Sequence, residues 1–284
     1  MNALKVEGLS KRYKSFSLEN VSFELPSGCI MGLIGENGAG KSTTIKALLG
    51  LISKDSGNIS ILGDDISNDN IRDKVGVVLD NVGIPPAFNV KDVDFIMKDT
   101  YSEWNSDTYY SYIKKFDLPE KTPFQKYSKG MKMRLGFAVA LSHNAKLLIL
   151  DEPTSGLDPV MRDEIIDILN DFTREENHSI LISSHIVSDL EKLCDYITFL
   201  HKGKLVLCEE KDVLLEQYGF VNMPSERLEE LDPSSIIGRK EGKFSTEAIV
   251  EKAKIPNGFE TKPITIEELF VFMVKNTEQR KIYT

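Results

Sequence analysis

Cysteine is scarce in this sequence, with Cys29, Cys194 and Cys208 the only three among 284 residues. They stand far apart, without a CxxC pair or a neighbouring histidine cluster, which excludes a disulfide framework and a zinc site. No apolar stretch approaches the roughly 18 residues that a membrane-spanning helix needs. The first residues, MNALKVEGLSKRY, carry no secretory signal. We therefore expect a soluble protein of the reducing cytoplasm, which needs a separate membrane-spanning partner if it works at a membrane.

Positive charge is in deficit, because 35 Lys and Arg stand against 44 Asp and Glu for a formal net charge of -9. An acidic surface repels the phosphates of nucleic acids and of anionic lipids, so we expect no nucleic-acid partner. With 41% hydrophobic and 28% charged residues, the composition is that of a folded globular chain and excludes wholesale disorder. Any anion that this protein binds must therefore be held by a local arrangement of groups.

Short apolar segments separated by turn residues predict strands, and amphipathic segments between them predict helices. Strands alternating with helices indicate a parallel sheet with crossover helices, and so an α/β fold. The expected elements are strands within 4–34 and at 58–62, 74–79, 147–150 and 179–183, helices at 41–49 and 163–172, and a helical insertion at about 85–141.

Beyond Glu210 the pattern weakens, and prolines separate short mixed segments before a helix-like ITIEELFVFMVK. We expect a small C-terminal extension over residues 216–284. Its role stays open between dimer contact, regulation and structural capping.

A glycine-rich segment, GENGAGKS at 35–42, joins the strand that ends at Ile34 to the helix predicted at 41–49. Backbone N–H groups of such a loop surround a phosphate, and the helix N-terminus adds partial positive charge. Lys41 can reach the β- and γ-phosphates, and the Ser42 hydroxyl can bind Mg²⁺. A plain glycine-rich turn would not explain the adjacent Lys-Ser-Thr. The predicted nucleotide-binding residues are Gly35, Asn37, Gly38, Ala39, Gly40, Lys41, Ser42 and Thr43.

Two adjacent carboxylates end the apolar strand LLIL at 147–150. Ligands of open parallel sheets bind at the carboxyl ends of the strands, where Asp151 would hold Mg²⁺. Side chains alternate along a strand, so we expect Glu152 to point the other way and to act as general base for the attacking water. An ordinary Asp-Glu turn is the alternative, and the nearby phosphate loop argues against it.

The order of three further motifs resembles the ATP-binding subunits of ABC transporters over residues 1–215. These motifs are Ser128-Lys129-Gly130-Met131, Ser155-Gly156-Leu157-Asp158 and the His185 that ends ILISSH. The resemblance implies a P-loop NTPase with a RecA-like core, an antiparallel β part and a helical subdomain at about 85–141. It also implies two nucleotide-binding chains that enclose two ATP molecules head to tail.

The resemblance assigns roles to five further residues. Tyr13 would stack on adenine, and Ser128 and Gly130 would touch the γ-phosphate held by the partner chain. Asp158 would link the two sites, and His185 would hold the γ-phosphate and the attacking water. Considered alone, Tyr13 has an alternative role in packing on an edge strand.

This sequence departs from the family pattern at two places. The signature usually has two glycines and a glutamine where this chain has Lys129, Gly130 and Met131, although YSKGM looks like a variant of exporter-type members. Asp80 stands where the family has a glutamine that senses Mg²⁺ and the membrane partner. A carboxylate is a good ligand for a hard cation, so we expect Asp80 to bind Mg²⁺, with Asn81 the alternative if the register differs by one.

The resemblance implies an ATPase, with ATP and Mg²⁺ as cofactors, that powers a separate transmembrane permease from the cytoplasmic face of the cell membrane. We expect the transporter to be an exporter. We expect this chain to pair with a second nucleotide-binding chain that is either a copy or a paralogue. The alternative is an ABC ATPase that acts on ribosomes or DNA, which the single P-loop and the net charge oppose. A P-loop kinase or GTPase would lack the 128–130 signature.

Overall fold

The computed structural model describes residues 1–284 except 67, 80–82, 257 and 281–284. Its main sheet has the strand order β10-β9-β3-β8-β7-β6, in which β10 is antiparallel to β9 and the other pairs are parallel. This confirms the predicted α/β class. The strands are β3 (Ile30–Ile34), β6 (Val75–Val78), β7 (Leu147–Asp151), β8 (Ser179–Ser184), β9 (Tyr196–His201) and β10 (Lys204–Glu210).

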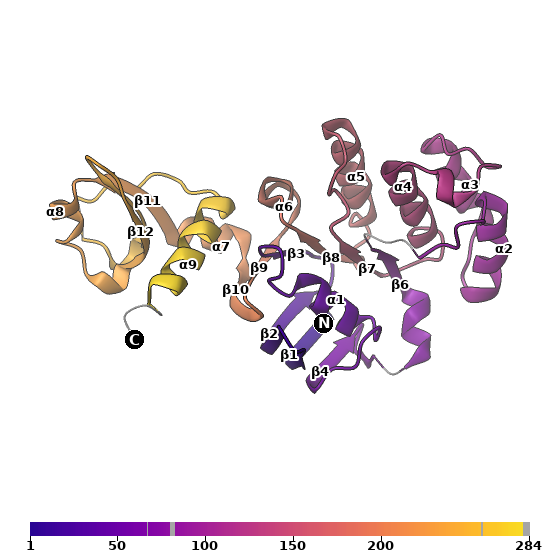
Figure 1. Ribbon diagram of the computed structural model, residues 1–284, viewed down its shortest axis with the longest axis horizontal. Helices are drawn as coiled ribbons and strands as arrows, with labels where there is room; N and C mark the ends of the chain where they lie inside the picture. The colour runs from indigo at the N-terminus through magenta and orange to yellow at the C-terminus, as the bar shows by residue number, and fades with distance from the viewer. Residues whose placement is uncertain (67, 80–82, 257, 281–284) are drawn as a thin grey trace.

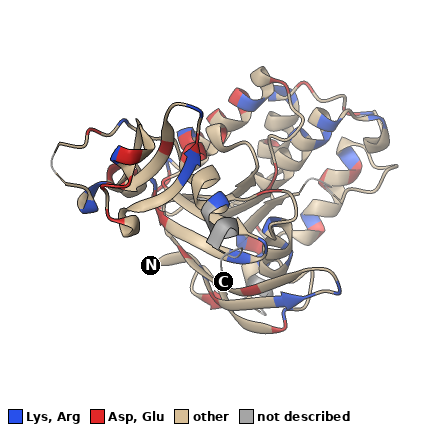
Figure 2. Ribbon diagram, turned by 60° about the vertical axis from the view of Figure 1, so that its left-hand side comes forward, with Lys and Arg blue, Asp and Glu red and all other residues tan. Residues whose placement is uncertain are grey.

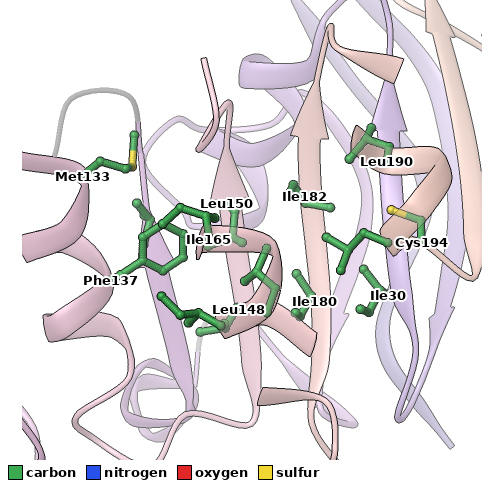
Figure 3. Close-up of a cluster of buried hydrophobic side chains, with 14 of the residues drawn as sticks. Ile30, Met133, Phe137, Leu148, Leu150, Ile165, Ile180, Ile182, Leu190 and Cys194 are labelled. Atoms are coloured by element: carbon green, nitrogen blue, oxygen red, sulfur yellow. The ribbon is translucent and has the colours of Figure 1, made fainter. Parts of the chain in front are cut away.

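Both faces of this sheet are buried, because consecutive apolar residues of each strand point to opposite sides. On one face, Leu148 and Leu150 of β7 pack with Ile180 and Ile182 of β8 against helices α4, α5 and α6 (Figure 3). The other face contributes Leu147, Ile149 and Leu181 to a second cluster with helix α1. The helices are α1 (Lys41–Leu48), α4 (Lys129–Ala140), α5 (Pro159–Phe172) and α6 (Val187–Leu193).

An antiparallel sheet with the order β2-β1-β4-β5 shares the cluster on the α1 side. In β2, for example, Val21, Phe23 and Leu25 are buried and the residues between them are exposed, because only one face of this sheet meets the core. This is the antiparallel part that the resemblance implied. The strands are β1 (Asn2–Arg12), β2 (Ser17–Pro26), β4 (Ser56–Ile61) and β5 (Asp64–Asp65).

The helical insertion lies at one end of the long axis of the molecule (Figure 1). Its first helix begins with a capping box, in which Asn89 and Asp92 each accept a backbone N–H of the other residue. Buried Asp94 then ties this helix to the next by accepting from Trp104 Nε1 at 2.9 Å and from Ser106 Oγ. With α4, the elements of the insertion are α2 (Val90–Thr100), α3 (Ser106–Lys115) and the 3₁₀ turn η2 (Phe124–Lys126), and another such turn, η1 (Asp69–Lys74), precedes β6.

The C-terminal segment lies at the opposite end (Figure 1) and contains a three-stranded antiparallel sheet with the order β11-β13-β12. The predicted helix is present as α9 (Ile266–Arg280), whereas the sheet is an element that the sequence pattern did not indicate. Half of the residues of β12 are exposed, and the strand carries Gly, Arg, Lys and Glu after its two isoleucines, so it lacks an apolar repeat. The remaining elements are β11 (Tyr218–Met223), β12 (Ile236–Glu241), β13 (Thr246–Glu251), α7 (Lys211–Gln217), α8 (Ser225–Leu228), η3 (Pro233–Ser235) and η4 (Lys252–Lys254).

Candidate nucleotide-binding site

The strand order β3-β8-β7 brings three predicted segments to one edge of the main sheet. The glycine-rich loop follows β3, Asp151 is the last residue of β7, and His185 comes directly after β8. Because these strands are parallel neighbours, their carboxyl ends meet at the same edge. Residues that are more than 140 positions apart in the chain therefore share one site.

Backbone conformation and close packing require glycine at three positions of the loop. Gly38 and Gly40 have φ values of 82° and 114°, which side chains of L-residues rarely adopt. A Cβ at Gly35 would lie 2.6 Å from the carbonyl oxygen of Leu200, so the loop rests directly on the end of β9. Gly40 precedes α1 without a side-chain cap, which leaves the first N–H groups of the helix for an anion.

Lys41 is 5% exposed and extends along this loop. Its Nζ donates to the carbonyl oxygen of Gly35 at 2.7 Å and lies 3.2 Å from Glu152 Oε1. The ammonium group therefore already faces an anion, and a bound phosphate would replace that carboxylate as its partner. Ser42 and Thr43 follow in the first turn of α1 and also line the cleft.

Asp151 is buried, and its carboxylate is oriented by Ser183 of the adjacent strand. The Ser183 hydroxyl donates to Asp151 Oδ1 at 2.6 Å and accepts the backbone N–H of Glu152 at 3.0 Å. The register of the sheet pairs Asp151 with Ser183, which places the hydroxyl between the two acidic residues. Sequence reasoning did not single out Ser183, because a register across two strands cannot be derived from one strand's pattern.

Glu152 differs from the prediction, since its side chain does not point away from Asp151. Strand β7 ends at Asp151, and Glu152 has a φ of 53°, so the alternation of side chains stops before it. Both carboxylates line the same cleft. Glu152 Oε2 lies 2.6 Å from His185 Nδ1, and its other oxygen faces Lys41. The candidate base is thus held between a lysine and a histidine.

These residues enclose a cleft of about 850 Å³. A volume of this size accommodates a nucleotide, since pockets for small ligands span roughly 300–1,000 Å³. The loop forms one wall, and the carboxylates and His185 form another. The lining residues are Ser15, Phe16, Glu36, Asn37, Gly38, Gly40, Lys41, Ser42, Thr43, Lys129, Asp151, Glu152, Ser155 and His185.

Comparison with known proteins assigns this arrangement to a family. The profile of the ABC transporter family matches residues 18–155. The lantibiotic transport ATP-binding protein SrtF of Streptococcus pyogenes is 40% identical over 242 residues, covering 84% of this chain and 99% of that protein. This chain belongs to the ATP-binding proteins of ABC transporters.

Two further similarities concern the function and the fold of this ABC subunit. The bacitracin transport ATP-binding protein BcrA of Bacillus licheniformis is 36% identical over 72% of this chain and 68% of that protein. A solved ATP-binding subunit of an ABC transporter matches with a TM-score of 0.68 at 28% identity, covering 76% of this chain and 92% of the other. The predicted exporter-type transporter subunit, which binds and hydrolyses ATP, is confirmed, and the alternative of a ribosome- or DNA-acting ATPase is not supported.

Tyr13 of the ABC subunit lies beside the glycine-rich loop, although it does not line the main cleft. It lines an adjoining hollow of about 470 Å³ together with Gly38, Ser15 and Phe16. The last three residues also line the main cleft, so the two hollows adjoin. Sequence reasoning missed Phe16, which offers a second aromatic ring on the way from Tyr13 to the loop.

Ser128, Gly130 and Asp158 are not among the described residues that line the cleft of their own chain. Ser128 caps α4 by accepting the N–H of Met131, and Asp158 caps α5 by accepting the N–H of Met161. A Cβ at Gly130 would lie 2.6 Å from Met161 Cε, so the beginnings of the two helices pack closely. Their predicted contacts with a partner's nucleotide stay predictions.

Magnesium has suitable oxygen donors in this ABC subunit. The Ser42 hydroxyl and the Asp151 carboxylate both line the cleft, and hard oxygen donors suit Mg²⁺. The described part of the chain contains no group of three His, Cys, Asp or Glu that could hold a metal alone. This donor set fits an ion whose coordination is completed by water and by the phosphates of the substrate. Asp80 and its alternative Asn81 lie outside the described residues.

The other three histidines, His143, His178 and His201, are not among the described residues that line the cleft. Burial lowers the pKa of His143, whose ring stacks on Tyr101 at 3.9 Å, and burial also lowers the pKa of His178. His201 is buried beneath the loop, with Nδ1 3.6 Å from Glu36 Oε2.

No helix in the described ranges is long and apolar enough to cross a membrane.

Proposed function

We propose that this ABC subunit binds Mg-ATP in the cleft between the glycine-rich loop and Glu152, and that ATP closes two such chains around the nucleotide. Closure and hydrolysis would drive a separate permease that exports its cargo, with this subunit on the cytoplasmic face of the membrane. The observation that carries the proposal is the convergence of Lys41, Asp151, Glu152 and His185 on one cleft. Lys and Arg are interspersed with Asp and Glu over the ribbon in Figure 2, which fits a subunit without a nucleic-acid partner.

The mechanism begins with an exchange of partners at Lys41. Polyphosphate would take the place of Glu152 beside the ammonium group, which frees the Glu152 carboxylate to accept a proton from the attacking water. His185, whose Nδ1 lies 2.6 Å from Glu152 Oε2, would hold the carboxylate in place beside the terminal phosphate. Contacts that exist only in the closed pair favour closure, and loss of the γ-phosphate removes them.

Magnesium would be held by the Ser42 hydroxyl and by Asp151, which Ser183 orients. The ion supplies charge that stabilises the phosphates during transfer. We propose Asp80 as an additional ligand, directly or through water, because in the sequence it comes two residues after the end of β6, which is the parallel neighbour of β7.

A groove of about 730 Å³ is the site that we propose for the permease. It is lined by Leu48, Leu49 and Leu51 after α1, by Val75 and Val77 of β6, and by Tyr101 of the helical insertion. This apolar lining suits a cytoplasmic helix of the permease. Leu79, which directly precedes Asp80 in the sequence, lines the same groove.

The variant Glu152→Gln tests nucleotide binding and pairing together. It removes the base and spares the phosphate-binding loop, so we expect Mg-ATP to convert monomers into stable dimers in analytical ultracentrifugation. Lys41→Ala is the matched control and should stay monomeric, because it lacks the phosphate partner. Failure of Glu152→Gln to bind ATP would overturn the proposed nucleotide-binding site. Tight binding of ATP without dimers would rule out a homodimer and favour pairing with a paralogous chain.

The cargo that we propose is a peptide antibiotic, the class to which lantibiotics and bacitracin belong. Relatives with "lantibiotic transport" and "bacitracin transport" in their names support it. A host that carries Lys41→Ala in place of the native chain should become more sensitive to such a peptide. Unchanged sensitivity to a panel of peptide antibiotics would remove this cargo class.

A further inference from the structure

The turn between β9 and β10 lies directly against the glycine-rich loop. The Gly203 N–H of this turn donates to the carbonyl oxygen of Ala39 at 2.9 Å. A Cβ at Gly40 would lie 3.7 Å from Gly203 Cα, so the two backbones approach closely there as well. The turn therefore supports the backbone of the loop, and His201, the last residue of β9, lies at this contact.

The side chain of His201 faces a carboxylate of the loop. His201 is 4% exposed, and its Nδ1 lies 3.6 Å from Glu36 Oε2, within the distance of an ion pair. Glu36 is the second residue of the loop, where its carbonyl oxygen accepts the N–H of Ala39 at 3.0 Å. Its exposed side chain lines the nucleotide cleft. A buried imidazole thus contacts an exposed carboxylate at the edge of the phosphate-binding loop.

Glu36 brings an unfavourable charge to a loop that binds a polyphosphate. Two other carboxylates line the cleft, and both have a use there. Asp151 would hold Mg²⁺, and Glu152 lies beside Lys41 and would act as the base. Glu36 has no such use, and like charges that share a cleft repel each other. Contact with His201 draws its carboxylate toward β9, and a protonated imidazole offsets its charge.

We infer that His201 is a positioning residue for nucleotide binding, which holds the Glu36 carboxylate away from the polyphosphate. His201 acts through Glu36, since it is not among the described residues that line the cleft. This inference rests on the proposed function, because it concerns the same nucleotide site. It predicts that the effect of His201 on ATP affinity depends on the charge at residue 36. A merely structural role of the buried ring would not depend on that charge.

The test is a double-mutant cycle in the full chain, with His201→Leu, Glu36→Gln and the variant that carries both. Leucine fills much of the space of the imidazole without its N–H group, and glutamine keeps the shape of Glu36 without its charge. The probe is the non-hydrolysable ATP analogue with a β,γ-imido bridge. Its affinity is measured by equilibrium dialysis with Mg²⁺, at a protein concentration where sedimentation shows monomers.

The matched control is His143→Leu, which removes another buried imidazole. The His143 ring stacks on Tyr101 and, among the described residues, does not line the cleft. This variant should bind the analogue as the native chain does. His201→Gln keeps an N–H group, should lose less affinity than His201→Leu, and takes its place in the cycle if His201→Leu does not fold.

We expect His201→Leu to weaken the analogue about tenfold, the size of one contact with a charged group. Glu36→Gln should bind it about twofold more tightly, because a negative charge is lost from the cleft. Adding His201→Leu to Glu36→Gln should then cost less than about twofold, since no carboxylate is left to hold.

Two results would overturn the inference. Equal losses with and without the Glu36 charge would show that the buried ring acts through packing alone, and native affinity in His201→Leu would show that it has no role in binding. A native chain that does not bind the analogue would instead overturn the proposed function, and the inference with it.

Discussion

Ser183 orients the site although it is not itself predicted to bind ATP or Mg²⁺. Its hydroxyl donates to Asp151 Oδ1 and accepts the N–H of Glu152, so one buried group fixes both acidic residues. Partners of this kind typically change metal affinity or activity by about 10- to 100-fold when removed. We expect Ser183→Ala to lower ATP turnover about tenfold and to raise the Mg²⁺ concentration for half-maximal activity.

The control for this prediction is another buried serine of the same strand. Ser179 lies at the opposite end of β8, where its hydroxyl accepts the N–H of Gly28. Ser179→Ala should therefore leave the Mg²⁺ titration of ATPase activity unchanged. If both variants shift the titration equally, the effect comes from the packing of β8, and the claim that Ser183 orients Asp151 is wrong.

At the scale of elements, the sequence predicted those whose signal is local. The strand 147–150 is an apolar run with both faces buried, and the helix at 41–49 follows a loop whose glycines mark its start. The structure has these as β7 and α1, within two residues of the expected bounds. Six of the eight residues predicted for the glycine-rich loop, all but Gly35 and Ala39, line one cleft together with the acidic pair.

Elements and contacts that depend on distant pairing were not predictable in the same way. The contact of Ser183 with Asp151 follows from the register of β7 with β8, which no single segment encodes. The direction of Glu152 follows from a left-handed backbone at the end of β7, where strand alternation no longer applies. The C-terminal sheet consists of short strands with glycines and charges, which pair through β13 in the middle.

At the scale of the whole molecule, one hydrophobic cluster joins the nucleotide-binding part to the C-terminal segment. Buried residues of β8, α6 and β9 belong to the same cluster as Ile249 of β13 and Leu269 of α9. Helix α9 lies between the main sheet and the C-terminal sheet in Figure 1, and Phe270 meets Phe199 of β9 edge to face at 5.1 Å. Phe199 pairs in the main sheet with Ile34, the last residue of β3 before the glycine-rich loop, so this contact lies on the strand next to that loop.

Phe270 is the residue at which this junction can be tested. Its ring is 8% exposed, so Phe270→Ala removes a buried aromatic side chain at the contact of two elements. Truncation of such a ring costs about 3–5 kcal/mol of unfolding free energy, and we expect a loss near the lower figure in urea unfolding. Because the cluster is continuous, the unfolding curve should remain a single transition with a lower midpoint. Val271→Ala on the same helix, 37% exposed, is the matched control and should cost less than about 1 kcal/mol. An early separate transition in Phe270→Ala would show instead that the C-terminal segment unfolds independently of the nucleotide-binding part.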